Sequence, residues 1–209
     1  MTIPGPIPKP GPSETRPGLA RLEAAIGERE PAGARGVDGG FIGSDLAVVD
    51  RALARIQSES LARGPLFCDW GSGLGAVCAV AAINGFSPLG IEIQSELVAS
   101  ARSLARDLGL DMSFAQGTFL LPGDEDLASG SENTRMRFDG RAWDALALAP
   151  GDCDVVFAYP WPGEEACIDG VFRRHASPGA LLVTFHDWDY LLVQRKVRGE
   201  TELASLGWM

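Results

Sequence analysis

The sequence is poor in the residues that build metal sites and disulfide frameworks. It has two histidines, His175 and His186, and four cysteines, no two of which have C-x-x-C spacing. Structural zinc sites are built from closely spaced cysteines and histidines. The cysteines lie at Cys68, Cys78, Cys153 and Cys167. We therefore expect no metal centre, and four reduced thiols that are mostly buried.

Long apolar runs and positive charge are also scarce. No window reaches the length of a membrane-spanning helix, and the proline-rich N-terminus lacks the apolar stretch of a signal peptide. The net charge is -10 and the pI is about 4.7, so the surface repels phosphate backbones and argues against a nucleic-acid partner. We expect a cytoplasmic protein that tolerates cationic substrates. The sequence indicates no particular oligomeric state.

The 209 residues fit one domain with tails better than two domains. Residues 1–18 contain six prolines and three glycines, which predicts a disordered tail. Residues 19–39 are expected to form a short helix, over 19–30, and a glycine-rich linker. The folded domain is expected to cover residues 40–209.

Strand and helix patterns alternate through the rest of the chain. Predicted strands cover 66–69, 88–93, 112–119, 154–159, 180–185 and 190–197. Predicted helices cover 45–62 (with Ser44 as N-cap), 76–84, 95–108, 142–148 and 164–175, and residues 122–140 are expected to form a long polar loop. This order predicts an α/β fold with a doubly wound, mostly parallel, Rossmann-like sheet. The sixth strand follows the fifth too closely for a helical crossover, so an antiparallel C-terminal edge hairpin is expected.

A glycine-rich turn joins the first strand to the next helix. It contains Gly71, Ser72, Gly73 and Gly75. Glycines allow a sharp turn and a close ligand, and the helix start offers free N–H groups that suit an anion. Glu92 ends the second strand, 19 positions after Gly73, where a carboxylate can accept both hydroxyls of a ribose. The pair predicts a nucleoside-containing cofactor.

The glycine spacing alone leaves the cofactor open. Gly71-x-Gly73-x-x-Ala76 also satisfies the dinucleotide fingerprint, which keeps an NAD-dependent oxidoreductase as a distant alternative. Asp69 stands two residues before Gly71, where its charge would repel a pyrophosphate and favour a cation such as the amino group of a methionine moiety. A substantial helix also precedes the first strand. Both features favour S-adenosylmethionine (SAM).

The segments Phe67–Gly75 and Gly90–Ile93 resemble motif I and the acidic second motif of class I SAM-dependent methyltransferases, over roughly residues 40–190. The resemblance implies that Asp69 faces the methionine end of SAM, that the glycine turn passes beside it, and that Glu92 holds the ribose, with Ile93 as a further cofactor contact. Thr118 and Phe119 would lie at the adenine, although Thr118 stands where the family often has an acid. Residues 41–45 with the following helix resemble the ATP synthase c-subunit lysine methyltransferases.

The segment after the fourth strand faces the methyl group in the resembled family. It contains Tyr159, Pro160, Trp161 and Glu164. Tyr159 replaces the Asn or Asp that amino-methylating members often carry. Tyr159, Pro160 and Trp161 are the expected substrate contacts, because aromatic rings attract a cation. Tyr159 and Glu164 are the catalytic candidates. Alternatively, Trp161 packs under the turn and the glutamate favours a helix start.

The expected function is SAM-dependent methyl transfer to a nitrogen nucleophile, with a protein lysine as one acceptor and a small molecule as the alternative. Tyr159 and Thr118 depart from the family pattern, which keeps open a non-catalytic SAM-fold binding module. His186, beside Asp187, is a lesser candidate for a general base.

Overall fold

The computed structural model describes residues 17–29, 44–128, 138, 141–186 and 190–197, together with the backbone of 203–208. Most of the predicted tail, the glycine-rich linker and Asp187 lie outside the described residues.

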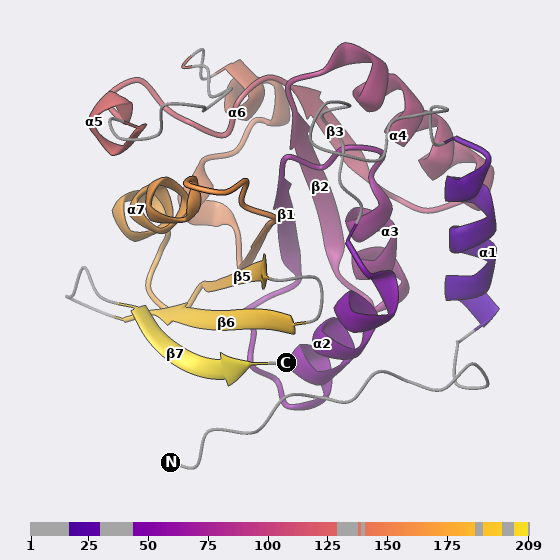
Figure 1. Ribbon diagram of the computed structural model, residues 1–209, viewed down its shortest axis with the longest axis horizontal. Coiled ribbons are helices and arrows are strands. Elements are labelled where there is room, and N and C mark those ends of the chain that lie inside the picture. Colours follow the sequence, from indigo (N-terminus) through magenta and orange to yellow (C-terminus); the bar gives the residue numbers. More distant parts are fainter. Residues whose placement is uncertain are drawn as a thin grey trace.

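One mixed sheet forms the centre of the described part of the chain (Figure 1), with strand order β3-β2-β1-β4-β5-β6-β7. The first five strands are parallel, whereas β6 runs antiparallel to β5 and β7 antiparallel to β6. The doubly wound sheet and its antiparallel edge hairpin are therefore confirmed. The strands are β1 (Leu66–Trp70), β2 (Ser87–Glu92), β3 (Ser113–Gln116), β4 (Val155–Ala158), β5 (Leu181–His186), β6 (Tyr190–Lys196) and β7 (Leu203–Trp208).

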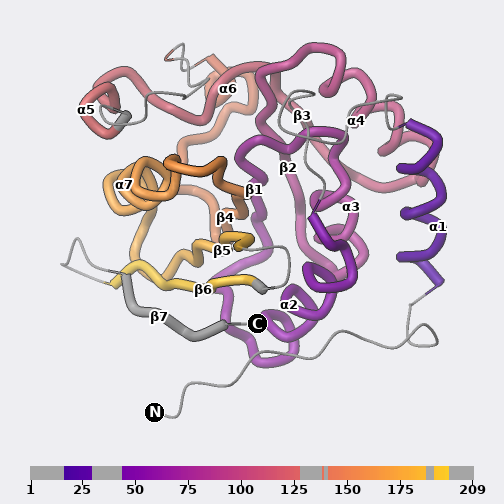
Figure 2. The backbone as a smooth tube through the Cα atoms, in the orientation of Figure 1, coloured from indigo at the N-terminus to yellow at the C-terminus, as the bar shows by residue number. Residues whose placement is uncertain are grey.

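Helices cover both faces of this sheet, as the tube in Figure 2 also shows. One face carries α1 (Pro17–Gly27), α2 (Leu46–Ser58), α3 (Ala76–Ile83) and α4 (Ser95–Leu108). The other face carries α6 (Arg141–Leu146) and α7 (Glu165–His175), with the short α5 (Glu125–Ala128) packed on α7 and a 3-10 turn at Pro150–Asp152. No helix in this described part is long and apolar enough to cross a membrane.

The alternation of side chains along β1 assigns its residues to the two faces. Phe67 packs in the core under α2 and α3, whereas Cys68 and Trp70 pack in the core under α6 and α7. Successive side chains in a strand point to opposite faces, so Asp69 lies on the side of Phe67. All four cysteines are free and buried, as expected.

The helix predicted in the linker region belongs to the main core. Leu19, Leu22 and Ile26 of α1 are buried, and α1 contacts α2, α3 and α4. Because α1 begins at Pro17, the predicted tail of residues 1–18 ends at least two residues too late. The core therefore includes residues from before residue 40.

Other boundaries also differ from the sequence predictions, and α2 ends at Ser58, four residues before the predicted end. Asp45, not Ser44, caps α2, because its Oδ1 accepts from the N–H groups of Ala47 and Val48 at 3.0 and 3.2 Å. A carboxylate with two acceptor oxygens is at least as good a cap as a hydroxyl. The predicted loop 122–140 contains α5. The third strand pairs only from Ser113 to Gln116, since the chain then leaves the sheet at Gly117, whose φ is 147°.

Candidate functional site

The glycine turn connects the end of β1 to the start of α3. Gly71, Gly73 and Gly75 have φ values of 86°, 52° and 78°, in the left-handed region that favours glycine. A Cβ on Gly75 would lie 2.7 Å from Cζ of Phe114, so this end of the turn packs tightly against β3. A Cβ on Gly71 would meet nothing within 4 Å, so this end borders open space. The turn thus has one packed end and one end accessible to a ligand.

Glu92 fixes the turn to the end of β2. Its Oε2 accepts from the Gly73 N–H at 3.0 Å and its Oε1 from the Gln94 N–H at 2.9 Å. The side chain is buried, with only 7% of the residue exposed. Each carboxylate oxygen has a second lone pair, so Glu92 can still accept two hydroxyl hydrogens. The structure thus places Glu92 beside Gly73, at the end of β2.

Two buried polar atoms, one at the end of β1 and one in the turn, have no hydrogen-bond partner among the described residues. Ser72 Oγ and Trp70 Nε1 are both in this state. Ser72 packs on β2, where a Cβ on Gly90 would lie 2.5 Å from Ser72 Oγ. An unsatisfied buried donor costs about 1–3 kcal/mol. Both atoms therefore lack the partner that a buried polar group usually has.

Asp69 lies beneath the turn, on the side of α3. Its Oδ2 is 4.0 Å from Sγ of Cys78, and the residue is 3% exposed. Burial raises the pKa of Asp69 to about 8, and the charge of Glu92 adds to the shift. The acid is therefore mostly neutral at pH 7, because burial disfavours its charged form. A neutral acid does not attract a cation by its charge, so this part of the sequence argument for SAM does not hold.

The residues that follow β3 reach the same edge of the sheet. The ring of Phe119 stacks on Trp70 with centroids 4.7 Å apart and planes at 2°, and its carbonyl accepts from Trp143 Nε1 at 2.9 Å. Thr118 is buried, and its Oγ1 accepts from the Leu120 N–H at 3.1 Å. Thr118 is thus fixed by the local chain, whereas Phe119 is fixed by Trp70 and Trp143.

The end of β2 meets the end of β3 through the backbone. The Gly117 N–H donates to the Glu92 carbonyl at 2.9 Å, and Gln116 Nε2 donates to the Ile93 carbonyl at 3.5 Å. The structure therefore brings the candidate cofactor residues of three strands together. This is the carboxyl edge of the sheet, where ligands of such folds bind.

The turn after β4 forms the neighbouring part of the edge, because Ala158 pairs with Trp70. Pro160 is buried, and the Trp161 N–H donates to Glu164 Oε2 at 3.3 Å. Burial raises the pKa of Glu164, partly offset by this hydrogen bond. The ring of Tyr159 lies 5.1 Å from that of Phe185. Glu164 thus accepts a hydrogen bond in the turn before α7, which agrees with the alternative that it favours the helix start. Its carboxylate is also partly desolvated.

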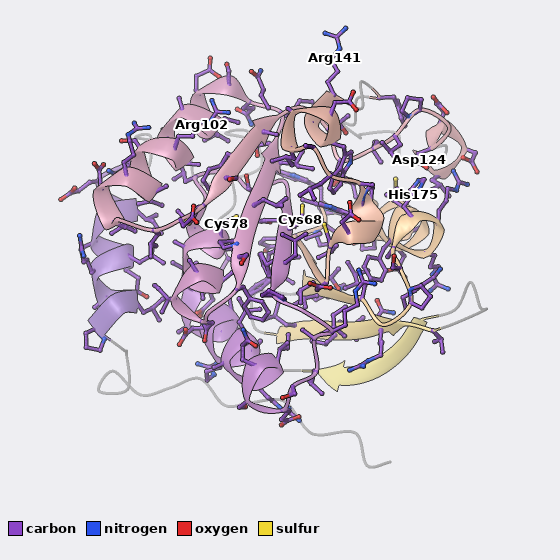
Figure 3. The ribbon with its side chains drawn as sticks, turned by 180° about the vertical axis from the view of Figure 1, so that it is seen from behind. Cys68, Cys78, Arg102, Asp124, Arg141 and His175 are labelled. Atoms are coloured by element: carbon purple, nitrogen blue, oxygen red, sulfur yellow. The ribbon has the colours of Figure 1, made fainter. Side chains whose placement is uncertain are left out.

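A cluster that the sequence patterns did not predict lies at the other end of α7 (Figure 3). Asp124 is fully buried, and its Oδ1 lies 2.8 Å from His175 Nε2 and 3.1 Å from Arg174 Nη1. Arg174 also pairs with Asp126 at 2.7 Å. These contacts fasten the segment after β3 to α7. Asp124 and His175 are 51 positions apart in the sequence, so no local pattern connects them.

No sequence model of a known protein family matches the chain, and no curated protein sequence matches it. Solved structures of similar chain trace include an RNA methyltransferase from Salinibacter ruber with S-adenosyl-L-homocysteine (21% identity, 68% of this chain, 76% of that chain, TM-score 0.46). Others are magnesium protoporphyrin IX methyltransferase from Synechocystis with SAM (16%, 82%, 77%, 0.45) and a SAM-dependent methyltransferase from Thiobacillus denitrificans (19%, 73%, 52%, 0.43). The chain spans about half the length of the last of these.

Proposed function

We propose that this chain binds SAM at the glycine turn and transfers its methyl group to an amine. The observation that carries the cofactor assignment is that the two halves of the sheet differ: only one of them is a complete nucleotide-binding half. Dinucleotide folds have two βαβαβ halves, one for each nucleotide. Here β1, β2 and β3 complete one half, but β5 turns directly into the antiparallel β6 and the second half is truncated. A single nucleoside fits this architecture better than NAD does.

The residues at the turn match the parts of such a ligand. Glu92 has two acceptor positions left for the ribose hydroxyls. The N–H groups at the start of α3 suit the methionine carboxylate. Ile93 follows Glu92 at the end of β2 and Phe119 follows β3 at the same edge of the sheet, and both would contact the adenine. Ser72 Oγ, buried without a partner, would gain one on binding.

SAM supplies a methyl group already activated by its sulfonium. The chain mainly has to align the acceptor, which can contribute about 7–11 kcal/mol. Tyr159 and Trp161 offer aromatic rings to a cationic amine, and Glu164 offers a carboxylate. Pro160, between Tyr159 and Trp161, restricts the backbone of this turn because its ring fixes φ. These features favour a lysine side chain or a small amine as acceptor.

Calorimetry of the full chain with SAM and with NAD tests the cofactor assignment. We expect SAM to bind and NAD not to bind. Tight NAD binding without SAM binding would overturn the proposal. Glu92→Ala should abolish SAM binding, whereas Glu96→Ala, an exposed glutamate in the first turn of α4, should not.

Labelled SAM incubated with a cell lysate tests methyl transfer. We expect label in the protein fraction for a lysine acceptor and in the small-molecule fraction for a small amine. Label in neither fraction, with SAM bound, would indicate a binding module without catalysis. Glu164→Gln should reduce transfer at unchanged SAM affinity.

A further inference from the structure

A histidine and a buried threonine form a hydrogen-bonded pair at the end of β5, next to the proposed acceptor turn. Thr184 Oγ1 lies 2.8 Å from His186 Nε2. Thr184 is 4% exposed, whereas the imidazole at the strand end is half-buried. A buried hydroxyl that fixes an imidazole at the carboxyl edge of a parallel sheet is an arrangement suited to proton transfer.

The register of the sheet places this pair beside the acceptor turn. Ala158 of β4 pairs with Thr184, and Tyr159 contacts Phe185 one residue further on. His186 ends β5 beside the turn that follows Ala158, but its side chain is on the opposite face of the sheet from the rings of Tyr159 and Phe185. Leu182 packs in the core under α7, and alternate residues of a strand share a face. Thr184 and His186 therefore point to the side of the sheet from which α7 starts.

Other titratable groups occupy the elements around His186. Glu164 and Glu165 lie at the start of α7, which covers the face of the sheet to which His186 points. The two glutamates supply negative charge at this end of α7, and negative charge stabilises an imidazolium. This surrounding favours a histidine that gains a proton during the reaction.

We infer that His186 is the general base that deprotonates the acceptor amine, and that Thr184 positions it; this inference rests on the proposed SAM-dependent methyl transfer. The ammonium of the acceptor gives one proton to the neutral imidazole. The freed amine lone pair then forms the bond to the methyl carbon. The carbon–sulfur bond breaks, and its electron pair stays on sulfur, which becomes a neutral thioether. The imidazolium donates from Nε2 to Thr184 Oγ1 and later loses its proton to water.

The two-histidine composition of the chain makes a direct test possible, because imidazole NMR signals come only from His175 and His186. The probes are SAM, with its charged sulfonium, and S-adenosylhomocysteine, which lacks that charge. An aligned nucleophile lies about 3 Å from the methyl carbon and within about 3 Å of its base, which puts the sulfonium about 8 Å from the imidazole. A unit charge at this distance lowers the titration midpoint of a histidine by about 0.4 to 1.5 pH units, for an effective dielectric constant between 80 and 20.

We expect the SAM complex to show a lower titration midpoint for His186 than the S-adenosylhomocysteine complex. His175 is the internal control, because it lies at the far end of α7, about 15 Å along the helix and beyond the screening length at physiological salt. Equal His186 midpoints in the two complexes would overturn the inference while leaving SAM binding intact. If neither compound binds in calorimetry, the proposed function itself fails, and the inference falls with it.

Variants of the pair test the role of Thr184. Thr184→Val keeps the shape and removes the hydroxyl, whereas Thr184→Ser keeps the hydroxyl. We expect the valine variant to lower the His186 midpoint in the SAM complex, and the serine variant to restore it. The pH dependence of label transfer to the lysate should follow the same order, and His186→Gln should lose its acidic limb. Identical midpoints and profiles in the valine variant and the wild type would refute the positioning role.

Discussion

Glu92→Gln separates the structural role of this carboxylate from its proposed ligand role. In the wild type its two oxygens accept from the N–H groups of Gly73 and Gln94, at 3.0 and 2.9 Å. The amide of glutamine has only one oxygen, so its NH₂ group must face one of these donors. The variant thus loses one hydrogen bond to a buried charged group, which costs about 1.5–3 kcal/mol. Urea denaturation should show this decrease in the free energy of unfolding.

The same substitution should weaken SAM more than folding alone explains. The remaining oxygen already serves a backbone N–H, so one ribose hydroxyl loses its charged acceptor. A loss of about 1.4–2.8 kcal/mol corresponds to a 10- to 100-fold higher Kd. Calorimetry at a temperature where the variant is fully folded measures this without interference from unfolding.

Glu96→Gln is the matched control, because it removes the same charge four residues away from an exposed position in the first turn of α4. We expect its stability to change by less than about 0.5 kcal/mol and its SAM affinity to stay unchanged. SAM affinity within twofold of wild type in Glu92→Gln would refute the ribose role. Unchanged stability would refute the role of Glu92 in holding the glycine turn.

Three further substitutions probe the surroundings of the site. Asp69 has a folded pKa of about 8, above its unfolded value, so its neutral form stabilises the fold fully below about pH 4, and this contribution is lost as the pH rises through 8. Asp69→Asn should therefore gain stability relative to wild type as the pH rises from about 4 to about 8, by up to about 1.4 kcal/mol per pH unit in urea melts; a constant difference over this range would contradict the buried neutral acid. Gly90→Ala should cost about 1–3 kcal/mol and weaken SAM, because its Cβ would press on Ser72 Oγ at 2.5 Å; wild-type Tm and Kd would exclude this packing. Arg174→Met should speed hydrogen exchange around Asp124 at unchanged SAM affinity, since it removes the 3.1 Å bond to that carboxylate. Exchange as slow as in the wild type would show that Arg174 is not needed to hold the segment after β3 against α7.

The sequence predicts the regular part of the fold well where local signals are complete. Helix α4 begins and ends as predicted, because Gly109 in the left-handed conformation stops it. Strand β7 was not predicted, since Leu203–Trp208 mixes small and apolar residues and gains its strand conformation by pairing with β6. Edge pairing of this kind depends on a neighbour that only the fold provides.

The site shows the same division between local and long-range information. The glycine turn and Glu92 follow from spacing, and the structure joins them by a hydrogen bond. The protonation of Asp69 does not follow from spacing, because burial under α3 raises its pKa. The contact of His186 with Thr184 also escapes motif reasoning. The sequence draws attention to the adjacent Asp187, whereas strand alternation pairs the imidazole with the residue two positions earlier.

The arrangement of strands suggests that cofactor binding and acceptor chemistry can be perturbed separately. Glu92 and the glycine turn are fixed by contacts between β1 and β2. The Thr184–His186 pair and Glu164 are fixed by β4, β5 and the start of α7, which lie beyond β1 from β2 in the strand order. Variants of the first group should therefore raise the Kd for SAM. Variants of the second group should lower turnover of bound SAM while the Kd stays the same. If every variant that lowers turnover also weakens SAM in proportion, the two groups form a single unit and the separate acceptor site is wrong.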